Sequence, residues 1–399
     1  MSKIELNIIK WIEAHKNILF LAAVILINCA MRIASRNYIS WDMDGFLLKW
    51  YDEFAASGGF KALKSTVGNY NLLYQTFLAA ISYLNLEGVD RVQAIKSLST
   101  IFDFMLSFLI AAMISEYKKE KLFEKSFCLS FALVMFLPTL ILNSAYWGQC
   151  DSIYTFFMLL SVYLLYKEKY IPAFIVLGIA FAFKLQTVFI LPFGIFYYFY
   201  KKRFSIFYIF ISLFTFWISG LAAYIHGGDI LLPFKIYLYQ TRTYPQMHVN
   251  IHNIWELLSG IKIDDVWYGV SYEYGSMLAY SLTLIILGSG LYMVIRGDKK
   301  PDSIKNIIEL AAWSVWTCAM FLPAMHERYT YPTDILLATA ALCDKKYIKF
   351  AFIEILISSL TYTAYLNNVF PQESWIAIFA MGAWVFYSME VFRVETKKM

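Results

Sequence analysis

Residues 17–35 read NILFLAAVILINCAMRIAS, a nearly unbroken apolar run that begins directly after Lys16. Helical residues in such a run are numerous enough to cross a hydrocarbon layer of about 30 Å. Similar runs recur along the chain, which has 399 residues, 60% of them hydrophobic and 16% charged. A soluble core cannot bury that much apolar surface. The sequence therefore predicts an all-α, multi-pass membrane protein, with the first run retained as an anchor rather than cleaved as a signal peptide.

The apolar runs predict about twelve spans that form one transmembrane domain over residues 1–399. The spans are expected at 17–35, 97–115, 126–143, 152–167, 171–185, 188–201, 204–225, 276–296, 304–323, 331–343, 347–367 and 375–393. Several are shorter than the roughly 20 residues of a perpendicular span, which is tolerated where helices line a cavity inside the protein.

The connections alternate between short basic turns and longer, chemically varied loops. The basic segments are the N-terminus, 118–121, 167–169, 201–203, 296–300, 345–349 and 393–398, and they hold most of the 34 Lys and Arg residues. The positive-inside rule places them, with both termini, on the cytoplasmic side of the plasma membrane. Long outer loops are then expected at 36–96 and 226–275, and short ones around 144–151, 324–330 and 368–374. The apolar stretch 70–84 and the amphipathic stretch 46–56 are expected to lie along the outer surface.

Cysteine usage and net charge exclude other classes of protein. The five cysteines lie in or beside apolar runs without paired spacing, so neither a disulfide framework nor a zinc site is expected. The net charge of +5 follows from the basic turns. No nucleic-acid partner is therefore expected.

Two acids follow the first span in the stretch Ser40-Trp41-Asp42-Met43-Asp44. A carboxylate held at the membrane surface beside aromatic residues gains proton affinity, as a general base for a sugar hydroxyl requires. Asp42 and Asp44 are the catalytic candidates. Asp44 could instead cap the helix that follows.

A second group of polar residues lies in the expected outer turns near 150 and 185. Trp147, Gln149 and Asp151 offer a stacking surface and polar groups for a sugar, or else an aromatic belt with a helix cap. Lys184 and Gln186 interrupt an apolar segment, where a charge is expensive unless it is functional or snorkels to the interface.

Ionisable residues also gather in the last two candidate loops. His326, Glu327, Arg328 and Tyr329 are consecutive, and a phosphate can be held by His and by the bidentate fork of Arg. The loop at 237–255 contains Arg242, together with His248 and His252 at a spacing that suits a metal only if that piece is helical. No metal is expected, although Asp42 and Asp44 could hold a divalent ion.

All these groups are expected on one face of the membrane. The cytoplasmic turns offer no glycine-rich phosphate cradle for a soluble nucleotide sugar. A lipid phosphate, in contrast, brings its anion to the membrane surface, where Lys, Arg and His side chains are expected.

Five motifs, in this order, resemble the GT-C superfamily of integral-membrane glycosyltransferases. They are Asp42 with Phe46-Leu-x-x-Trp-Tyr51, Gly68-Asn-Tyr-Asn71, Trp147-Gly-Gln-x-Asp151, Lys184-x-Gln186 and His326-Glu-Arg-Tyr329. The resemblance is closest to bacterial relatives of the second GPI mannosyltransferase, and more distant to the dolichyl-phosphate-glucose-dependent glucosyltransferases. The family's Tyr-Asn-Pro-Pro-Tyr is replaced here by Tyr70-Asn-Leu-Leu-Tyr74.

The resemblance implies inverting transfer of a hexose from a polyprenyl-phosphate donor to a glycolipid or cell-envelope glycan. Asp42 would be the base, with Asp44 as second choice. Lys184, His326, Arg328 and, more weakly, Arg242 would hold the donor phosphate. Trp147, Gln149, Asp151, Gln186, Glu327 and Tyr329 would hold the sugar or the acceptor. A transporter of lipid-linked sugars and a surface-glycan polymerase or ligase are the alternatives.

Overall fold

The described part of the chain is almost wholly helical, which confirms the predicted all-α class. The computed structural model describes residues 1–258, 261–263, 266–268, 270–369 and 375–393. Two short strand pairs accompany the helices. The predicted outer turn at 368–374 and the basic segment at 393–398 lie mostly outside the described residues.

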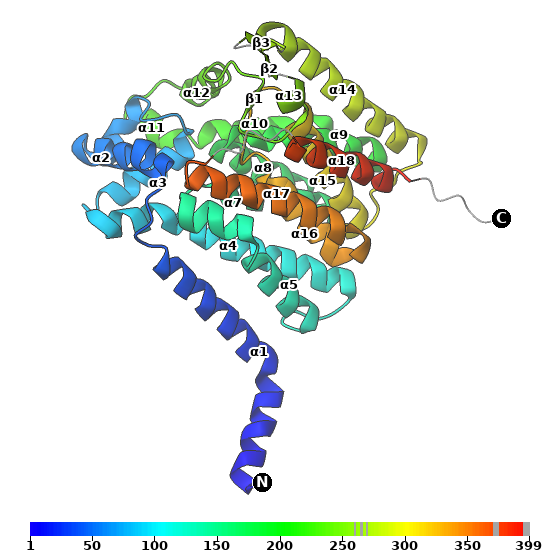
Figure 1. Cartoon of the computed structure of the whole chain (residues 1–399). Coiled ribbons are helices and arrows are strands. Elements are labelled where there is room, and N and C mark those ends of the chain that lie inside the picture. Colours follow the sequence, from blue (N-terminus) through cyan, green and yellow to red (C-terminus); the bar gives the residue numbers. More distant parts are fainter. Residues whose placement is uncertain (259–260, 264–265, 269, 370–374, 394–399) are drawn as a thin grey trace, which may run out of the picture.

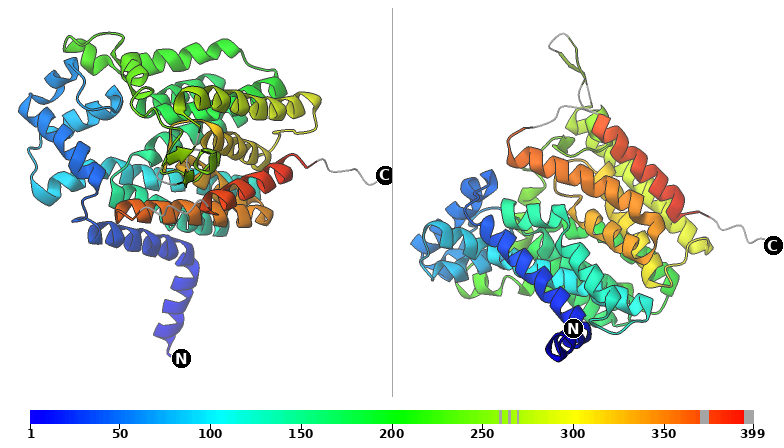
Figure 2. Two further views of the ribbon diagram at one scale, coloured as in Figure 1. Left: turned by 45° about the horizontal axis from the view of Figure 1, so that its top comes forward. Right: turned by 60° about the horizontal axis from the view of Figure 1, so that its bottom comes forward.

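The first helix, α1 (Lys3–Ala34), extends away from the body of the molecule at its N-terminal end (Figures 1 and 2). It begins with a capping box, in which the Ser2 hydroxyl accepts the backbone N–H of Glu5 at 3.2 Å. Its C-terminal half contacts the body, where Arg32 forms an ion pair of 2.7 Å with the buried Asp103. This charged contact fixes the point at which the chain enters the first loop.

The first loop folds into short helices at one end of the body, drawn in blue in Figure 1. They are the π-helical turn η1 (Met43–Leu47), α2 (Leu48–Ala56), η2 (Gly59–Lys64) and α3 (Leu72–Ser82). With 11 residues, α3 rises about 16 Å, too little to cross a membrane. It packs against α2 and η2 instead.

The body of the molecule is a helical bundle. Its first half comprises α4 (Gly88–Lys118), α5 (Lys125–Met135), α6 (Pro138–Ile141), η3 (Leu142–Trp147), α7 (Asp151–Tyr166), α8 (Tyr170–Phe183), η4 (Leu185–Ile190), α9 (Leu191–Lys201), η5 (Ile206–Tyr208), α10 (Ile209–Ile218) and α11 (Leu221–Ile225). Its second half comprises α12 (Leu232–Gln240), β1 (His248–Val249), α13 (Ile254–Leu258), β2 (Ile261–Ile263), β3 (Val266–Tyr268), α14 (Tyr272–Arg296), α15 (Ile304–Phe321), β4 (Met325–His326), α16 (Tyr331–Cys343), η6 (Lys345–Tyr347), α17 (Ile348–Leu366) and α18 (Trp375–Val391).

Helix α15 lies at the centre of this bundle. Every residue from Ile307 to Phe321 is buried, and the helix contacts α7, α9, α14, α16 and α18. β1 pairs in parallel with β4, directly after α15, while β2 pairs antiparallel with β3. The β1–β4 pair therefore ties the second long loop to the turn that carries His326.

The prediction of twelve spans is wrong. Among the described residues, four helices are long and apolar enough to cross a membrane: α1, α4, α14 and the combined η6–α17. A fifth is gained if α5 and the α6–η3 segment, bent by 54°, count as one span. Most other predicted spans are helices of 10–17 residues, which rise only about 15–26 Å. An apolar run indicates that its residues are buried, and here many of these residues are buried against other parts of the protein and not against lipid.

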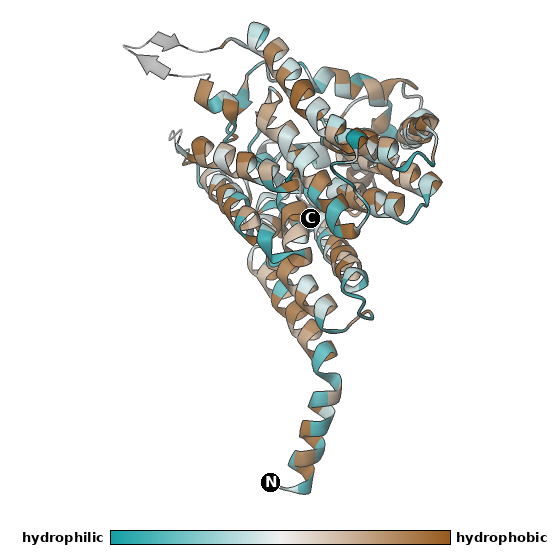
Figure 3. Ribbon diagram, turned by 90° about the vertical axis from the view of Figure 1, so that its right-hand side faces the viewer, coloured by the Kyte–Doolittle hydropathy of each residue, from teal (hydrophilic) through white to brown (hydrophobic). Residues whose placement is uncertain are grey.

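Several outer helices, both long and short, expose apolar side chains outward. Leu26 on α1, Leu284 on α14 and Phe386 on α18 are each more than 60% exposed. Figure 3 shows hydrophobic residues along the outer helices. The molecule thus has helices of the length and surface expected in a multi-pass membrane protein.

The basic turns gather at one end of the bundle. Lys167 pairs with Glu116 at 2.7 Å and Lys201 with Glu168 at 2.6 Å, which joins the ends of α4, α7 and α9. The ammonium of Lys118 donates to the Cys343 carbonyl at 3.4 Å. Lys346 reaches Glu390 at 3.1 Å, and Asn17 of α1 donates to the Phe123 carbonyl at 2.9 Å. Most of the predicted cytoplasmic turns are therefore neighbours.

Candidate active site

A pocket of about 540 Å³ lies where the first loop meets the bundle. Its walls come from the first loop, the α8–η4 junction, the residues after α12, the turn after α15 and the end of α17. The polar lining residues include Asp42, Gln149, Lys184, Gln186, His326, Glu327, Arg328, Tyr329 and Tyr365. Most of the residues singled out from the sequence thus share one cavity.

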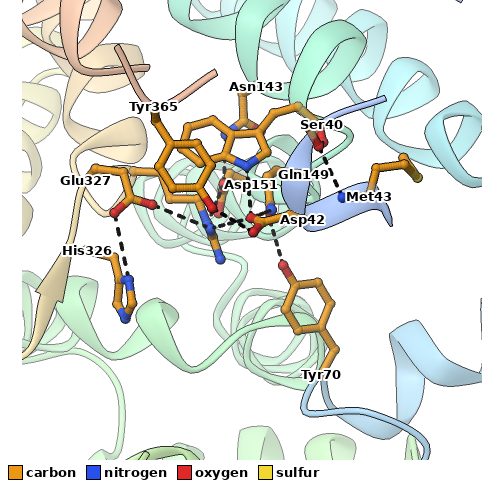
Figure 4. A network of polar contacts seen from close by, with 12 residues as sticks. Ser40, Asp42, Met43, Tyr70, Asn143, Gln149, Asp151, His326, Glu327 and Tyr365 are labelled. Atoms are coloured by element: carbon orange, nitrogen blue, oxygen red, sulfur yellow. Dashed lines mark hydrogen bonds and ion pairs between the residues drawn. The ribbon is translucent and has the colours of Figure 1, made fainter. Parts of the chain in front are cut away.

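Asp42 is the centre of a polar network in this pocket (Figure 4). Its Oδ2 accepts hydrogen bonds from the Trp147 indole at 2.8 Å and the Gln149 amide at 2.6 Å. The same oxygen lies 3.3 Å from Nη1 of Arg328, and Oδ1 accepts the Tyr365 hydroxyl at 2.8 Å. Four donors therefore fix the carboxylate, which remains partly exposed to the pocket.

The backbone before η1 sets the direction of Asp42. The Ser40 hydroxyl donates to the Trp147 carbonyl at 2.7 Å and accepts the Met43 backbone N–H at 3.1 Å. Gly148 adopts a φ of +79°, and a Cβ at this position would lie 2.4 Å from the Met43 side chain. The glycine of Trp-Gly-Gln is therefore required by a left-handed backbone and by a close approach.

Trp147 and Gln149 donate to the same oxygen of Asp42 but differ in their access to the pocket. The fully buried Trp147 ring stacks on Tyr365 at 4.4 Å and does not line the pocket. Gln149 lines the pocket, and its Oε1 accepts the Tyr70 hydroxyl at 2.6 Å. The structure thus uses Trp147 to hold the acid rather than as an open stacking surface for a sugar.

Asp151 is a buried anion that holds two cations. It forms an ion pair with Lys184, accepts the Asn143 amide at 2.8 Å and lies 3.6 Å from Nε of Arg328. Asp151 is 0% exposed and does not line the pocket, whereas Lys184 and Arg328 do. Lys184 can reach Asp151 because its backbone is extended (φ −154°, ψ 137°) between α8 and η4.

The residues of the His-Glu-Arg-Tyr turn face the pocket together. Arg328 lies 3.8 Å from Glu327 and places its guanidinium 5.7 Å from the Trp147 ring centre. His326 packs against Tyr244 and Tyr329, with ring centres 4.7 Å and 5.1 Å apart. The ring of Tyr329 lies 6.3 Å from that of Phe189.

Burial changes the charge state of two groups in this turn. Desolvation, with Arg328 and Lys184 nearby, lowers the pKa of His326 to about 3, so the imidazole is neutral at pH 7. Desolvation raises the pKa of Glu327 to about 7 although Arg328 opposes the shift. His326 can therefore donate a hydrogen bond to a phosphate but does not supply the positive charge that the sequence predicted.

Besides Trp147 and Asp151, two further predicted residues do not line the pocket. Asp44 and Arg242 are exposed and absent from its lining. In η1, Asp44 lies two residues after Asp42 and so points to a different side of the turn. Asp42 is therefore the acid that the geometry favours.

Other residues contribute that the sequence did not single out for the site. Tyr365 lies in α17 without a motif, and Asn143 lies in η3 among apolar residues. Nothing in their local sequence marks either position. Tyr365 joins the site because α17 packs against η3. Asn143 joins it through its hydrogen bond to Asp151, eight residues further along the chain.

The described residues offer no group of three or more His, Cys, Asp or Glu side chains that could hold a metal ion. His248 and His252 do not share a helix, since His248 lies in β1 and His252 precedes α13. His252 instead contacts Glu256 at 2.8 Å. His252 therefore has a local structural role through its contact with Glu256.

Comparison with known proteins gives no match: no family model fits the chain, and no curated protein is significantly similar to it.

Proposed function

We propose that this chain is an inverting glycosyltransferase of the GT-C kind. It would move a hexose from a polyprenyl-phosphate donor to a hydroxyl of a glycolipid or cell-envelope glycan. The observation that carries the proposal is the contact of 3.3 Å between Asp42 and Arg328, which puts a candidate base and a phosphate-binding cation in one pocket.

Asp42 has the properties of a general base for the acceptor hydroxyl. Its carboxylate is held by four donors but remains open to the pocket. As the hydroxyl oxygen attacks the sugar carbon opposite the phosphate, its proton passes to Asp42. Fixed orientation of the carboxylate lowers the entropic cost of this step.

The cationic side of the pocket suits the leaving phosphate. Lys184 and Arg328 are held by Asp151, and neutral His326 adds a hydrogen-bond donor. Positioned cations stabilise the negative charge that develops as the bond from sugar to phosphate breaks. A lipid-linked donor also fits the apolar residues that line the same pocket, which include Phe46, Phe183 and Phe189.

The charge distribution supports an orientation of the bundle in the plasma membrane. The linked basic turns would face the cytoplasm, with the N-terminal end of α1 on the same side. The pocket would then open on the other face, where lipid-linked sugars are consumed.

The test uses the full chain in sealed proteoliposomes with a radiolabelled polyprenyl-phosphate hexose and a panel of lipid acceptors. We expect a labelled glycoside to form without any nucleotide sugar. Asp42→Asn, which keeps the shape of the side chain, should reduce the rate at least about 100-fold, whereas Asp44→Asn should retain most of it. Wild-type activity in Asp42→Asn would reject the assigned base. Movement of intact donor across the bilayer without transfer would favour the transporter alternative.

A further inference from the structure

Glu327 is the second acid that lines the pocket, besides Asp42, and it is 3% exposed. It lines the large pocket and also a second cavity of about 10 Å³, the size of roughly one water molecule. The second cavity is lined by Ile251, His252, Glu327, Thr330, Glu354, Ile357, Ser358 and Thr361. Glu327 thus lies between the candidate active site and a small second cavity, most of whose lining residues are polar in type.

The charges around the pocket leave Glu327 without a cation of its own. Of the described lining residues, only Lys184 and Arg328 are positive at neutral pH, because His326 is neutral. Asp151 contacts both cations and Asp42 contacts Arg328. Arg328 lies 3.8 Å from Glu327, which is longer than a hydrogen bond. An ionised Glu327 would therefore make the site net negative and would repel a phosphate.

The neutral acid is the form that accommodates an anion. Titratable or charged groups face Glu327 from every element around it: Asp42 from the first loop, Asp151 from α7, His326, Arg328 and Tyr329 from its own turn, Tyr365 from α17, and His252 and Glu354 across the second cavity. A phosphate that enters this set adds a further negative charge and favours the proton on Glu327.

We propose that Glu327 works as a neutral carboxylic acid that gives its proton to the phosphate oxygen released from the sugar. This inference rests on the proposed function. It adds a catalytic acid on the leaving-group side, opposite the base Asp42.

The acceptor oxygen forms a bond to the sugar carbon, and its proton moves to Asp42. The bond from that carbon to the phosphate oxygen breaks, and its electron pair stays on the phosphate. Glu327 passes its proton to the phosphate, which leaves as a lipid monophosphate with one negative charge instead of two. Asp42 then releases its proton to water and Glu327 regains one, so no oxidant, reductant or further reactant is needed.

The first test is the pH dependence of transfer. Because the pKa of free Glu327 is raised to about 7, wild-type kcat/KM should fall as the pH rises above that value and the acid becomes ionised. Glu327→Gln keeps the shape but carries no transferable proton, so we expect a rate about 10–100-fold lower and no alkaline decline. Glu327→Asp should restore part of the rate together with the decline. Glu53→Gln, on the exposed face of α2, is the control and should match the wild type.

The second test does not require turnover. A short polyprenyl phosphate methyl ester keeps one negative charge across the pH range. Calorimetry of its binding at pH 8 in two buffers of different ionisation heat measures the protons taken up. We expect uptake approaching one proton in the wild type and none in Glu327→Gln.

The outcomes separate the two proposals. No proton uptake by the wild type, unchanged uptake in Glu327→Gln, or an alkaline decline that persists in Glu327→Gln would each overturn the role of Glu327. Proton uptake by a wild-type protein that transfers no hexose would support the protonation of Glu327 and overturn the proposed function.

Discussion

At the scale of single residues, the site depends on the buried pair of Lys184, which lines the pocket, and Asp151, which does not. Asp151 is 0% exposed and Lys184 6%. Removing Lys184 leaves buried Asp151 with only the more distant Arg328 as a partner, which costs more than removing both members of the pair. The pair also orients Arg328, which lies 3.6 Å from Asp151.

We therefore expect Lys184→Met to lower the free energy of unfolding by about 3–5 kcal/mol. The double variant Lys184→Met/Asp151→Asn should recover much of that loss, because no unpaired charge then remains. Thermal unfolding in detergent, read as a double-mutant cycle, measures the difference. Equal stability of the single and double variants would contradict the assigned ion pair.

Motif spacing predicted much of the site at this scale. It gave Asp42, Lys184 and the 326–329 turn, because polar residues in apolar surroundings stand out in a sequence. It could not give Tyr365, a tyrosine in an apolar helix, since only tertiary packing brings that hydroxyl to Asp42. It also could not predict the charge of His326, which depends on burial by residues far away in sequence.

At the scale of elements, the short turns η1 and η3 hold the site together. Gly148 ends η3 with a positive φ, in contact with Met43 of η1. Gly45 also lies in η1, but a Cβ there would meet nothing within 4 Å. The two glycines form a matched pair for testing the junction.

Gly148→Ala should destabilise the protein by about 1–3 kcal/mol and shift Gln149 away from Asp42, with a loss of transfer. Gly45→Ala should leave stability unchanged or slightly higher. Melting temperature and transfer rate, measured side by side, check both. A harmless Gly148→Ala would show that the junction is looser than its geometry indicates.

The sequence predicted the positions of the helices better than it predicted which of them span the membrane. Each predicted span contains helix, yet most of these helices are too short to cross, because an apolar run is the same whether lipid or protein covers it. Helix α15 is the clearest example of an apolar run covered by protein, since every residue from Ile307 to Phe321 is buried.

At the scale of the whole molecule, the pocket and the basic turns should face opposite sides of the membrane. Cys29 is exposed and the other four cysteines are buried, so Cys29→Ala gives a background of low reactivity. In this Cys29→Ala background, Glu53→Cys on α2 and Lys202→Cys after α9 place one exposed thiol at each end of the molecule. We expect an impermeant maleimide added to intact cells to label position 53 but not 202. Labelling of both, or of 202 alone, would contradict the orientation.

The bonds of Lys118 to Cys343, Lys167 to Glu116 and Lys346 to Glu390 fasten the helix ends at the basic side into one block. Because these helix ends are linked, the basic side of the bundle stays closed, and the pocket exchanges its contents only at the opposite end. We therefore expect turnover to proceed without any leak of ions between the two compartments, and spent lipid to depart sideways past the blue first-loop helices of Figure 1.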